Sequence, residues 1–210
     1  MSQFAGKTIL VTGTSRGLGA ALASVLEAEA ARVIRHTRAM GDLASPAGIA
    51  AVAGQVSKLD ILVHNAAINP APDETIDELS PETLRAVFAV NVEAPIFLTT
   101  ALLGPLRAAR GQVLAVSSEA GMFSNGMGPT GLSYRASKAA LNAFVLVAAQ
   151  ALAADGIRVN AVHPGWVRTD MGGDEAPLSP EDAARDVVAV LLRADKPTGR
   201  IFQAGVEADW

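Results

Sequence analysis

A short apolar run, a cluster of glycines and a helix-forming segment follow one another near the start of the chain and strongly constrain its fold. Residues 8–12 are predicted to form a buried strand, because they are mostly apolar and are bounded by a Gly-Lys pair and by Gly13. Gly17 and Gly19 come next, and residues 20–28, rich in alanine and leucine, are predicted to be helical. Strand, glycine turn and helix in this order begin a βαβ unit, whose turn and helix N-terminus can hold a phosphate group.

Short apolar runs and helix-like segments alternate along the rest of the chain as well. Pro95 is expected to kink one long helix, and a Ser-Pro pair at Ser179 marks the start of the last one. This alternation predicts a parallel sheet covered on both faces, and no linker divides it, so we expect residues 1–210 to form a single doubly wound α/β domain. The predicted strands are 8–12, 32–37, 59–63, 112–116, 157–162 and 199–203, and the predicted helices are 20–28, 81–106, 134–153 and the one that begins at Ser179.

Composition excludes several classes of protein and site. Half of the residues are hydrophobic, 18% are charged and the formal net charge is −4, which argues against a disordered chain and against a nucleic-acid surface. The chain has no cysteine, which excludes disulfides and thiolate zinc sites, and its histidines lie in no carboxylate cluster that would suggest a metal. With no apolar run near 18 residues and no apolar leader, we expect a cytoplasmic protein without a membrane partner.

Tyr134 is the only tyrosine in the chain, and Lys138 follows it by four residues. In a helix this spacing places a phenol and an ammonium on the same face. A nearby positive charge lowers the pKa of a phenol from its usual value of about 10, which improves it as an acid and base near neutral pH. Taken alone, the spacing also fits a surface helix with one aromatic anchor and a solvated lysine.

Small and polar residues follow the predicted strands at the positions where parallel sheets bind ligands. Segments 64–67, 117–121 and 163–169 follow the third, fourth and fifth of these strands. The carboxyl ends of parallel strands meet on one rim, so these segments are expected to gather there. Asn91 lies four residues before Pro95, where a kinked helix exposes backbone carbonyls and an amide could hold a water; the alternative is an asparagine on the helix surface.

Taken in order, these motifs resemble those of the short-chain dehydrogenase/reductase family, over nearly the whole chain, and its C-factor-like branch in particular. That family has a Rossmann-like sheet, as predicted here. The motifs that carry the resemblance are Thr12-Gly13-x-x-x-Gly17-x-Gly19, His64-Asn65-Ala66-Ala67, Asn91, Ser118, Tyr134-x-x-x-Lys138 and Pro164-Gly165.

The resemblance implies a catalytic set. Tyr134 would be the general acid in carbonyl reduction and the base in the reverse reaction. Lys138 would lower the pKa of this tyrosine and hold the nicotinamide ribose, and Asn91 would complete a proton relay through a water. Ser118 would donate a hydrogen bond to the substrate oxygen, and it is preferred over Ser117 because it fits the family's Ser-x-x-Gly pattern.

The resemblance also implies a cofactor site. Asn65 and Ala66 would line the adenosine side, and Val167 and Thr169 would meet the nicotinamide carboxamide. The complete predicted set is Gly13, Ser15, Arg16, Gly17, Leu18, Gly19, Arg38, Asp42, Leu43, Asn65, Ala66, Tyr134, Lys138, Pro164, Gly165, Val167 and Thr169.

The chain departs from the family pattern in two places. His64 and Ala67 replace the usual asparagine and glycine, and we interpret His64 as a structural hydrogen-bonding residue, as we do His36 and His163. In the family, the region that corresponds to residues 38–59 contains a helix, a strand and another helix. This chain has only about 20 residues there. We therefore expect the first of these helices, and most of the strand that precedes Asp42-Leu43, to be missing.

The end of the second strand bears on the choice of cofactor. An NAD enzyme of this class has an acidic residue there for the ribose 2′-hydroxyl, whereas this chain has Arg35-His36-Thr37-Arg38. Arg16 and Arg38 would instead bind a 2′-phosphate by charge-assisted hydrogen bonds, which predicts NADP(H) in preference to NAD(H). The alternative is that both arginines are merely solvated.

The second strand itself is predicted to form an edge of the sheet. Both faces of residues 32–37 carry basic or titratable side chains, which are costly on a covered strand and ordinary at an edge. We expect at most a vestigial strand around residues 40–43 outside it. The adenine end of the site should then be open, and NADP should bind more weakly than the glycine turn suggests.

These features predict an NADP(H)-dependent oxidoreductase that interconverts a carbonyl compound and its alcohol. Two alternatives stay open: a dinucleotide-binding protein that senses redox state or signals without catalysis, and an isomerase or dehydratase of the extended relatives, against which the chain length and glycine spacing count. Residues 126–131 and 171–177 would form the mouth of the site and suit a small or apolar substrate. We expect a homodimer or homotetramer that pairs through the helices at 81–106 and 134–153.

Overall fold

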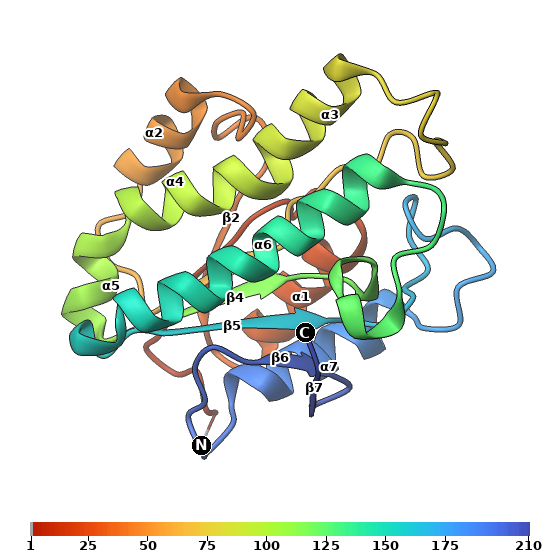
Figure 1. The fold of residues 1–210 in the computed structure, drawn as a ribbon. Coiled ribbons are helices and arrows are strands. Elements are labelled where there is room, and N and C mark those ends of the chain that lie inside the picture. Colours follow the sequence, from red (N-terminus) through yellow and green to blue (C-terminus); the bar gives the residue numbers. More distant parts are fainter. Residues whose placement is uncertain (1) are drawn as a thin grey trace.

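A mostly parallel sheet of seven strands forms the centre of the molecule (Figure 1). The computed structural model describes residues 2–210, apart from the side chain of Asn125. The order across the sheet is β2-β1-β3-β4-β5-β6-β7, and only β7 runs antiparallel to its neighbour. This is the Rossmann-like arrangement that the sequence predicts. The strands are β1 (Thr8–Val11), β2 (Arg32–Arg35), β3 (Ile61–His64), β4 (Gln112–Val116), β5 (Arg158–His163), β6 (Ile201–Gln203) and β7 (Val206–Ala208).

Helices cover both faces of the sheet because side chains alternate along each strand. Leu10 of β1 packs into the core beneath α2 (Pro46–Gly54), α4 (Ala94–Ala101) and α6 (Leu132–Ala151). Its neighbours Ile9 and Val11 pack into a second core, against α1 (Gly17–Ala28) and α7 (Pro180–Leu191). Figure 1 shows these two groups of helices on opposite sides of the sheet.

The long helical stretch before β4 is interrupted near Pro95, as predicted, and again at Leu102. It consists of α3 (Pro81–Phe88), a π-helical turn (Ala89–Glu93), α4 and α5 (Leu103–Ala109). Pro95 lies in the first turn of α4, where its missing N–H leaves the preceding turn without a regular partner. By length and apolar composition alone Pro81–Ala101 could cross a membrane, but the core helix of a soluble protein passes the same test, and this one packs against α2 and α6.

Strand β2 forms the sheet edge, which confirms that prediction. It ends at Arg35, earlier than expected, and in the described chain no strand lies between it and β3. The sequence analysis did not predict α2 (Pro46–Gly54), which begins at a Ser45 cap. Val33 and Ile34 of β2 are each only partly buried, against α1 on one face and the α2 side on the other. The shortened segment therefore lacks the strand and keeps one covering helix.

Candidate active site

Helix α6 places Tyr134 and Lys138 one turn apart, as their spacing predicts. The Lys138 ammonium lies 5.5 Å from the centroid of the Tyr134 ring. Lys138 is 2% exposed, and its Nζ donates a hydrogen bond of 2.8 Å to the carbonyl of Val116, the last residue of β4. Helix α6 is thereby fixed to the carboxyl end of the central strand β4.

Burial dominates the proton equilibria of this pair. Removal from water raises the pKa of Tyr134 to about 12, and a hydrogen bond with Ser118 acts in the opposite direction. Burial also lowers the pKa of Lys138 to about 8, because a desolvated ammonium is costly. At neutral pH the phenol therefore keeps its proton and the lysine still carries most of its charge.

The loop after β4 brings Ser118 to Tyr134. A side chain at Gly121 would place its Cβ 2.6 Å from the carbonyl carbon of Lys138, so the Ser-x-x-Gly spacing lets this loop pack directly on α6. Ser117 points elsewhere, and its hydroxyl donates a hydrogen bond of 2.6 Å to the buried side chain of Asn142. The two serines thus separate into one that faces the phenol and one that ties the strand end to α6.

Asn91 lies in the π-helical turn and is 1% exposed. Its Oδ1 accepts from the backbone N–H of Ile68 at 2.9 Å, and its Nδ2 donates to the carbonyl of Ile68 and to Ser137 Oγ, both at 3.0 Å. Ser137 in turn donates to the carbonyl of Tyr134 at 2.7 Å. The amide of Asn91 is therefore fully engaged and links the loop after β3 to α6, so a relay water at this turn would use backbone carbonyls.

The glycine turn after β1 packs tightly against the loop after β3. Gly13 has φ +71, and a Cβ there would lie 2.9 Å from the Cα of Ala66. A Cβ at Gly19 would overlap the carbonyl oxygen of Gly13 and the amide of Asn65. That amide donates to the carbonyls of Thr12 and Gly13 at 2.8 and 3.1 Å. The side chain of Asn65 therefore holds the backbone of the glycine turn in place through these two hydrogen bonds.

The N-terminus of α1 is open to an anion. Arg16 at its N-cap makes no side-chain capping bond, so the first N–H groups of the helix are not satisfied by a cap. Backbone donors and the positive end of the helix dipole suit a phosphate. The cradle left by the glycines and this uncapped helix end fit the pyrophosphate of a dinucleotide.

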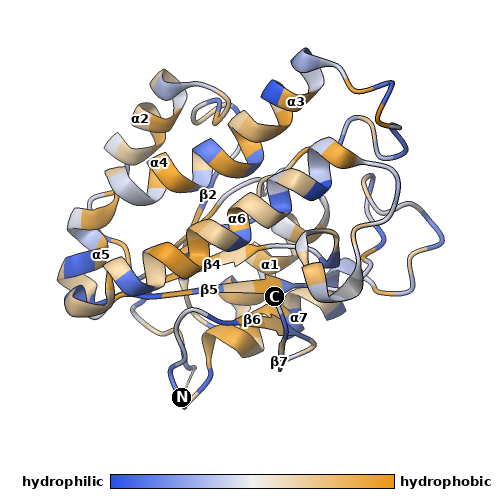
Figure 2. Ribbon diagram, in the orientation of Figure 1, coloured by the Kyte–Doolittle hydropathy of each residue, from blue (hydrophilic) through white to orange (hydrophobic). Residues whose placement is uncertain are grey.

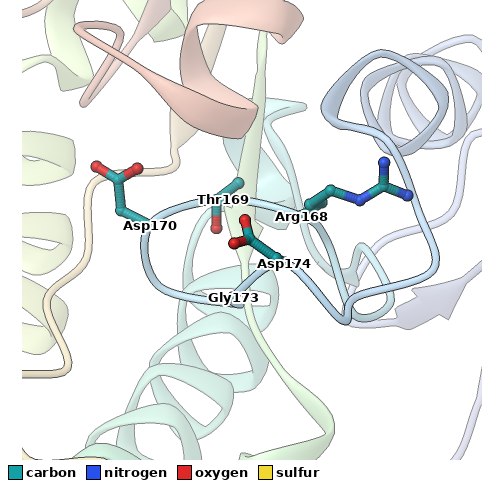
Figure 3. A pocket seen from close by; sticks show the side chains of 5 residues that line it. All are labelled: Arg168, Thr169, Asp170, Gly173 and Asp174. Carbon is teal, nitrogen blue, oxygen red and sulfur yellow. The ribbon is translucent and has the colours of Figure 1, made fainter.

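The loop after β5 folds over this helix end. Asp170 lies 3.1 Å from the guanidinium of Arg16, and a Cβ at Gly17 would lie 3.1 Å from the methyl group of Thr169. Arg168 is directed away from that side, toward the carbonyl of Ala176 at 3.1 Å. Figure 3 shows the resulting ring of chain, with Arg168 and Asp170 pointing in different directions around a cavity of about 370 Å³. Of the two residues predicted to meet the nicotinamide, Thr169 therefore lies beside the glycine turn, and Val167 is buried and pairs with Leu178.

Comparison with known proteins agrees with this geometry. A family model described as short chain dehydrogenase matches residues 40–177. The chain belongs to the short-chain dehydrogenase/reductase family. Its members are oxidoreductases, and this dehydrogenase shares their sheet as well as their motifs.

Two curated relatives illustrate the range of the family. The dehydrogenase is 31% identical to the 3-oxoacyl-[acyl-carrier-protein] reductase FabG of Escherichia coli over 191 residues, which cover 80% of this chain and 76% of that protein. It is 32% identical to C-signal of Myxococcus xanthus over 155 residues, covering 72% and 93% of the two chains.

Two solved structures show the same fold with bound cofactors. One is an NADPH-bound carbonyl reductase from chicken fatty liver, 25% identical, with a TM-score of 0.85 over 98% of this chain and all of that one. The other is a Brucella ovis oxidoreductase of the family with a partially ordered NAD, 29% identical, with a TM-score of 0.78 over 94% and 98% of the chains. Related proteins thus bind either dinucleotide.

The residues predicted to bind the adenosine end of the cofactor differ in how exposed their side chains are. Arg38 is 3.9 Å from Asp42, and both side chains are exposed. Leu43 is 6% exposed and packs in the core, so only its backbone is available to an adenine. Arg16 is also exposed, and within the described part of the chain its ion pair is with Asp170. The two guanidiniums are therefore free to turn toward a ligand.

The three histidines are buried and make different contacts. His64 lies 2.8 Å from Thr99 Oγ1, and burial lowers its pKa to about 3, in agreement with a structural role. His163 is 3.8 Å from a carboxylate oxygen of Glu119, and burial lowers its pKa while Glu119 opposes that effect. Among the described residues no group of histidines and carboxylates could hold a metal.

Two buried residues position the site through contacts that the sequence analysis did not predict, although it interpreted His36 as structural. His36 accepts from the N–H of Gly13 through Nδ1 at 3.2 Å, and its Nε2 lies 2.9 Å from the carbonyl of Gly41. It joins the glycine turn to the shortened segment. Glu74 is buried and accepts from the N–H of Ser133 at 2.7 Å, which caps the first turn of α6. No local pattern marks either contact, because the partners lie 23 and 59 residues away.

Proposed function

We propose that this dehydrogenase interconverts a carbonyl compound and its alcohol with NADP(H), and that Tyr134 is its proton donor. The observation that carries the proposal is the meeting of Ser118, Tyr134 and Lys138 at the carboxyl edge, beside an uncapped helix end and a glycine cradle. A binding module has no need of a buried phenol beside a buried ammonium. When bound, the reduced nicotinamide supplies the hydride that adds to the carbonyl carbon.

Each member of the set has a distinct task. The Tyr134 hydroxyl donates its proton to the carbonyl oxygen as negative charge develops there, a role that contributes about 10²–10⁴-fold to the rate in enzymes. Ser118, hydrogen-bonded to the same phenol, holds the substrate oxygen in reach of that proton. The Lys138 ammonium favours the tyrosinate that remains and thereby lowers the cost of proton transfer. In alcohol oxidation the same tyrosinate takes the proton back.

The preference for NADP(H) rests on Arg16 and Arg38. Arg38 follows the end of β2, where an acidic residue would otherwise select a 2′-hydroxyl, and Arg16 lies in the glycine turn. Both are exposed enough to turn onto a 2′-phosphate. The NADPH-bound carbonyl reductase from chicken lends support by analogy.

A second candidate is a dinucleotide-binding protein that signals without turnover. The similarity to C-signal, which extends over 93% of that relative, supports this candidate. The two candidates differ in one cheap assay. Loss of NADPH absorbance with a panel of aldehydes and ketones supports the enzyme, and tight NADPH binding without reduction of any panel member supports the sensor.

We further propose a cytoplasmic homodimer or homotetramer. Phe97 on α4 and Val147 on α6 are 55% and 68% exposed, which suits pairing through these helices. Light scattering at micromolar concentration tests this, and a monomeric mass contradicts it.

A further inference from the structure

Exposed apolar side chains gather around the mouth of the candidate active site. Among the described residues, eight large apolar side chains are exposed, and five of them belong to the loops after β3 and β4, the start of α6 or the loop after β5. Figure 1 shows these segments together beyond the arrowheads of the strands, and Figure 2 shows apolar stretches within them. The five are Ile76, Phe123, Leu132, Trp166 and Met171.

These segments are in mutual contact. The carbonyl of Glu74, in the loop after β3, accepts from the N–H of Gly131 at 2.9 Å. His163, where the loop after β5 begins, lies 3.8 Å from Glu119 in the loop after β4. The loops that carry these apolar side chains therefore adjoin one another at the carboxyl ends of the strands, where α6 begins with Tyr134 in its first turn. Apolar patches of this kind on a soluble protein usually mark a binding surface.

The charge of the same three loops is strongly one-sided. Segments 65–80, 117–131 and 164–178 contain eight carboxylates and one basic residue, Arg168, whereas the complete chain has a net charge of only −4. Arg168 is turned onto the carbonyl of Ala176 at 3.1 Å. Nearby Arg135 likewise donates to the carbonyl of Thr130 at 2.8 Å. No side chain of these loops therefore offers a free positive charge to a substrate.

The basic groups suited to phosphate lie outside the three loops, and one of them, Arg16, pairs with Asp170 of the loop after β5 at 3.1 Å. Arg16 and Arg38 flank the glycine turn and the shortened segment, where the cofactor phosphates are expected. A field of one sign over an opening alters the local concentration of charged ligands, over about 8 Å at physiological ionic strength. The mouth should thus repel a polyanion that approaches Tyr134 and leave a neutral molecule unaffected.

We propose that the mouth selects neutral, apolar carbonyl compounds and discriminates against polyanionic ones. The inference rests on the proposed reductase function and specifies its substrate class. A matched pair of substrates tests it: one 3-oxoacyl group presented as its N-acetylcysteamine thioester, which is neutral, or as its coenzyme A thioester, which carries phosphates. Both offer the same carbonyl group to Tyr134 and the same thioester.

The expected result is a kcat/KM about tenfold higher or more for the neutral thioester at low salt, with the gap narrowing as sodium chloride is added. Glu175→Lys should narrow the gap about threefold at low salt. Glu29→Lys is the matched control, because Glu29 follows the carboxyl end of α1, close to where β2 begins and at the opposite end of the strands from the mouth. This variant should leave the ratio of the two kcat/KM values unchanged.

The apolar part of the proposal has its own variant. Phe123 is 70% exposed, so Phe123→Ser should fold normally. It should raise KM several-fold for a bulky aryl ketone and leave KM for a small aliphatic ketone unchanged. Equal or better use of the coenzyme A thioester, unaffected by salt, would overturn the proposed selectivity while the reductase function stands. Absence of turnover with every neutral substrate would overturn the reductase function and the selectivity together.

Discussion

The two ends of the candidate site differ in how their polar side chains are held. At the catalytic end, Lys138 and Asn91 are 2% and 1% exposed and are fixed by hydrogen bonds to other elements. At the adenosine end, the side chains of Arg16 and Arg38 are 77% and 81% exposed, and a single carboxylate lies near each. Proton transfer requires atoms in fixed positions, whereas recognition of a phosphate by charge tolerates side chains that move. The strand and helix that are missing from the shortened segment would have lain at the adenosine end, which tolerates mobile side chains.

The largest expected effect is at the catalytic end. Tyr134→Phe keeps the ring but removes the proton donor, so turnover should fall about 10²–10⁴-fold or more while NADPH still binds. Stopped-flow or steady-state oxidation of NADPH, together with a fluorescence titration of the cofactor, measures both quantities. Turnover like that of the wild type in this variant would remove Tyr134 from the mechanism.

The next effect concerns Lys138 and depends on pH. Its lowered pKa of about 8 means that the ammonium loses its proton as pH rises through that value, whereas Tyr134 stays protonated until about 12. The kcat/KM for reduction should therefore decline above pH 8. Lys138→Met should lower the rate roughly tenfold to hundredfold and abolish this limb of the profile. A wild-type profile that stays flat up to about pH 10 would contradict the assignment.

The same lysine makes a prediction about stability. Its pKa falls from 10.5 to about 8 on folding, so between these values the unfolded chain binds more protons than the folded one. The free energy of unfolding of the wild type should therefore rise with pH across this window, relative to Lys138→Met. Urea denaturation of both proteins at the two ends of the window measures the difference.

Local patterns made much of the fold and the catalytic end predictable. Most of the parallel strands are apolar runs, the glycine turn precedes α1, and residues four apart, such as Tyr134 and Lys138, share a face in any helix. The missed elements lack such patterns. Helix α2 contains glycines and is apolar on every side, so it forms because Ser45 caps it and Ile49 and Val52 are buried. Strand β7 is a short, mostly exposed hairpin strand, and it has no buried face that would produce an apolar pattern in the sequence.

His36 provides a sharper test of the comparison, because its buried side chain joins the glycine turn to the shortened segment. In His36→Asn the amide oxygen can replace Nδ1 and accept from Gly13, but the contact with Gly41 is lost. In His36→Gln the reverse holds. If the bond to the glycine turn matters for the cofactor, the Gln variant should raise KM for NADPH about tenfold, with kcat little changed, and the Asn variant should remain near the wild type.

A single matched pair decides which contact of His36 is important. An increase in KM confined to the Asn variant would show that the Gly41 contact, and hence the position of the shortened segment, controls cofactor binding. An equal increase in KM for NADPH in both variants, together with a lowered melting temperature, would show that His36 contributes to stability alone.

The smallest expected effect is at Arg38, because an exposed guanidinium is well solvated before it binds anything. Arg38→Ala should raise KM for NADPH a few-fold and leave KM for NADH unchanged, since only NADPH carries the 2′-phosphate. The difference should shrink as salt is added, because the interaction is screened over about 8–10 Å. Arg32→Ala is the control: Arg32 is exposed at the start of β2, which is the end of that strand away from the glycine turn and from Arg38. Equal changes for the two cofactors would show that Arg38 does not contact the 2′-phosphate, and the NADP(H) proposal would then depend on Arg16 alone.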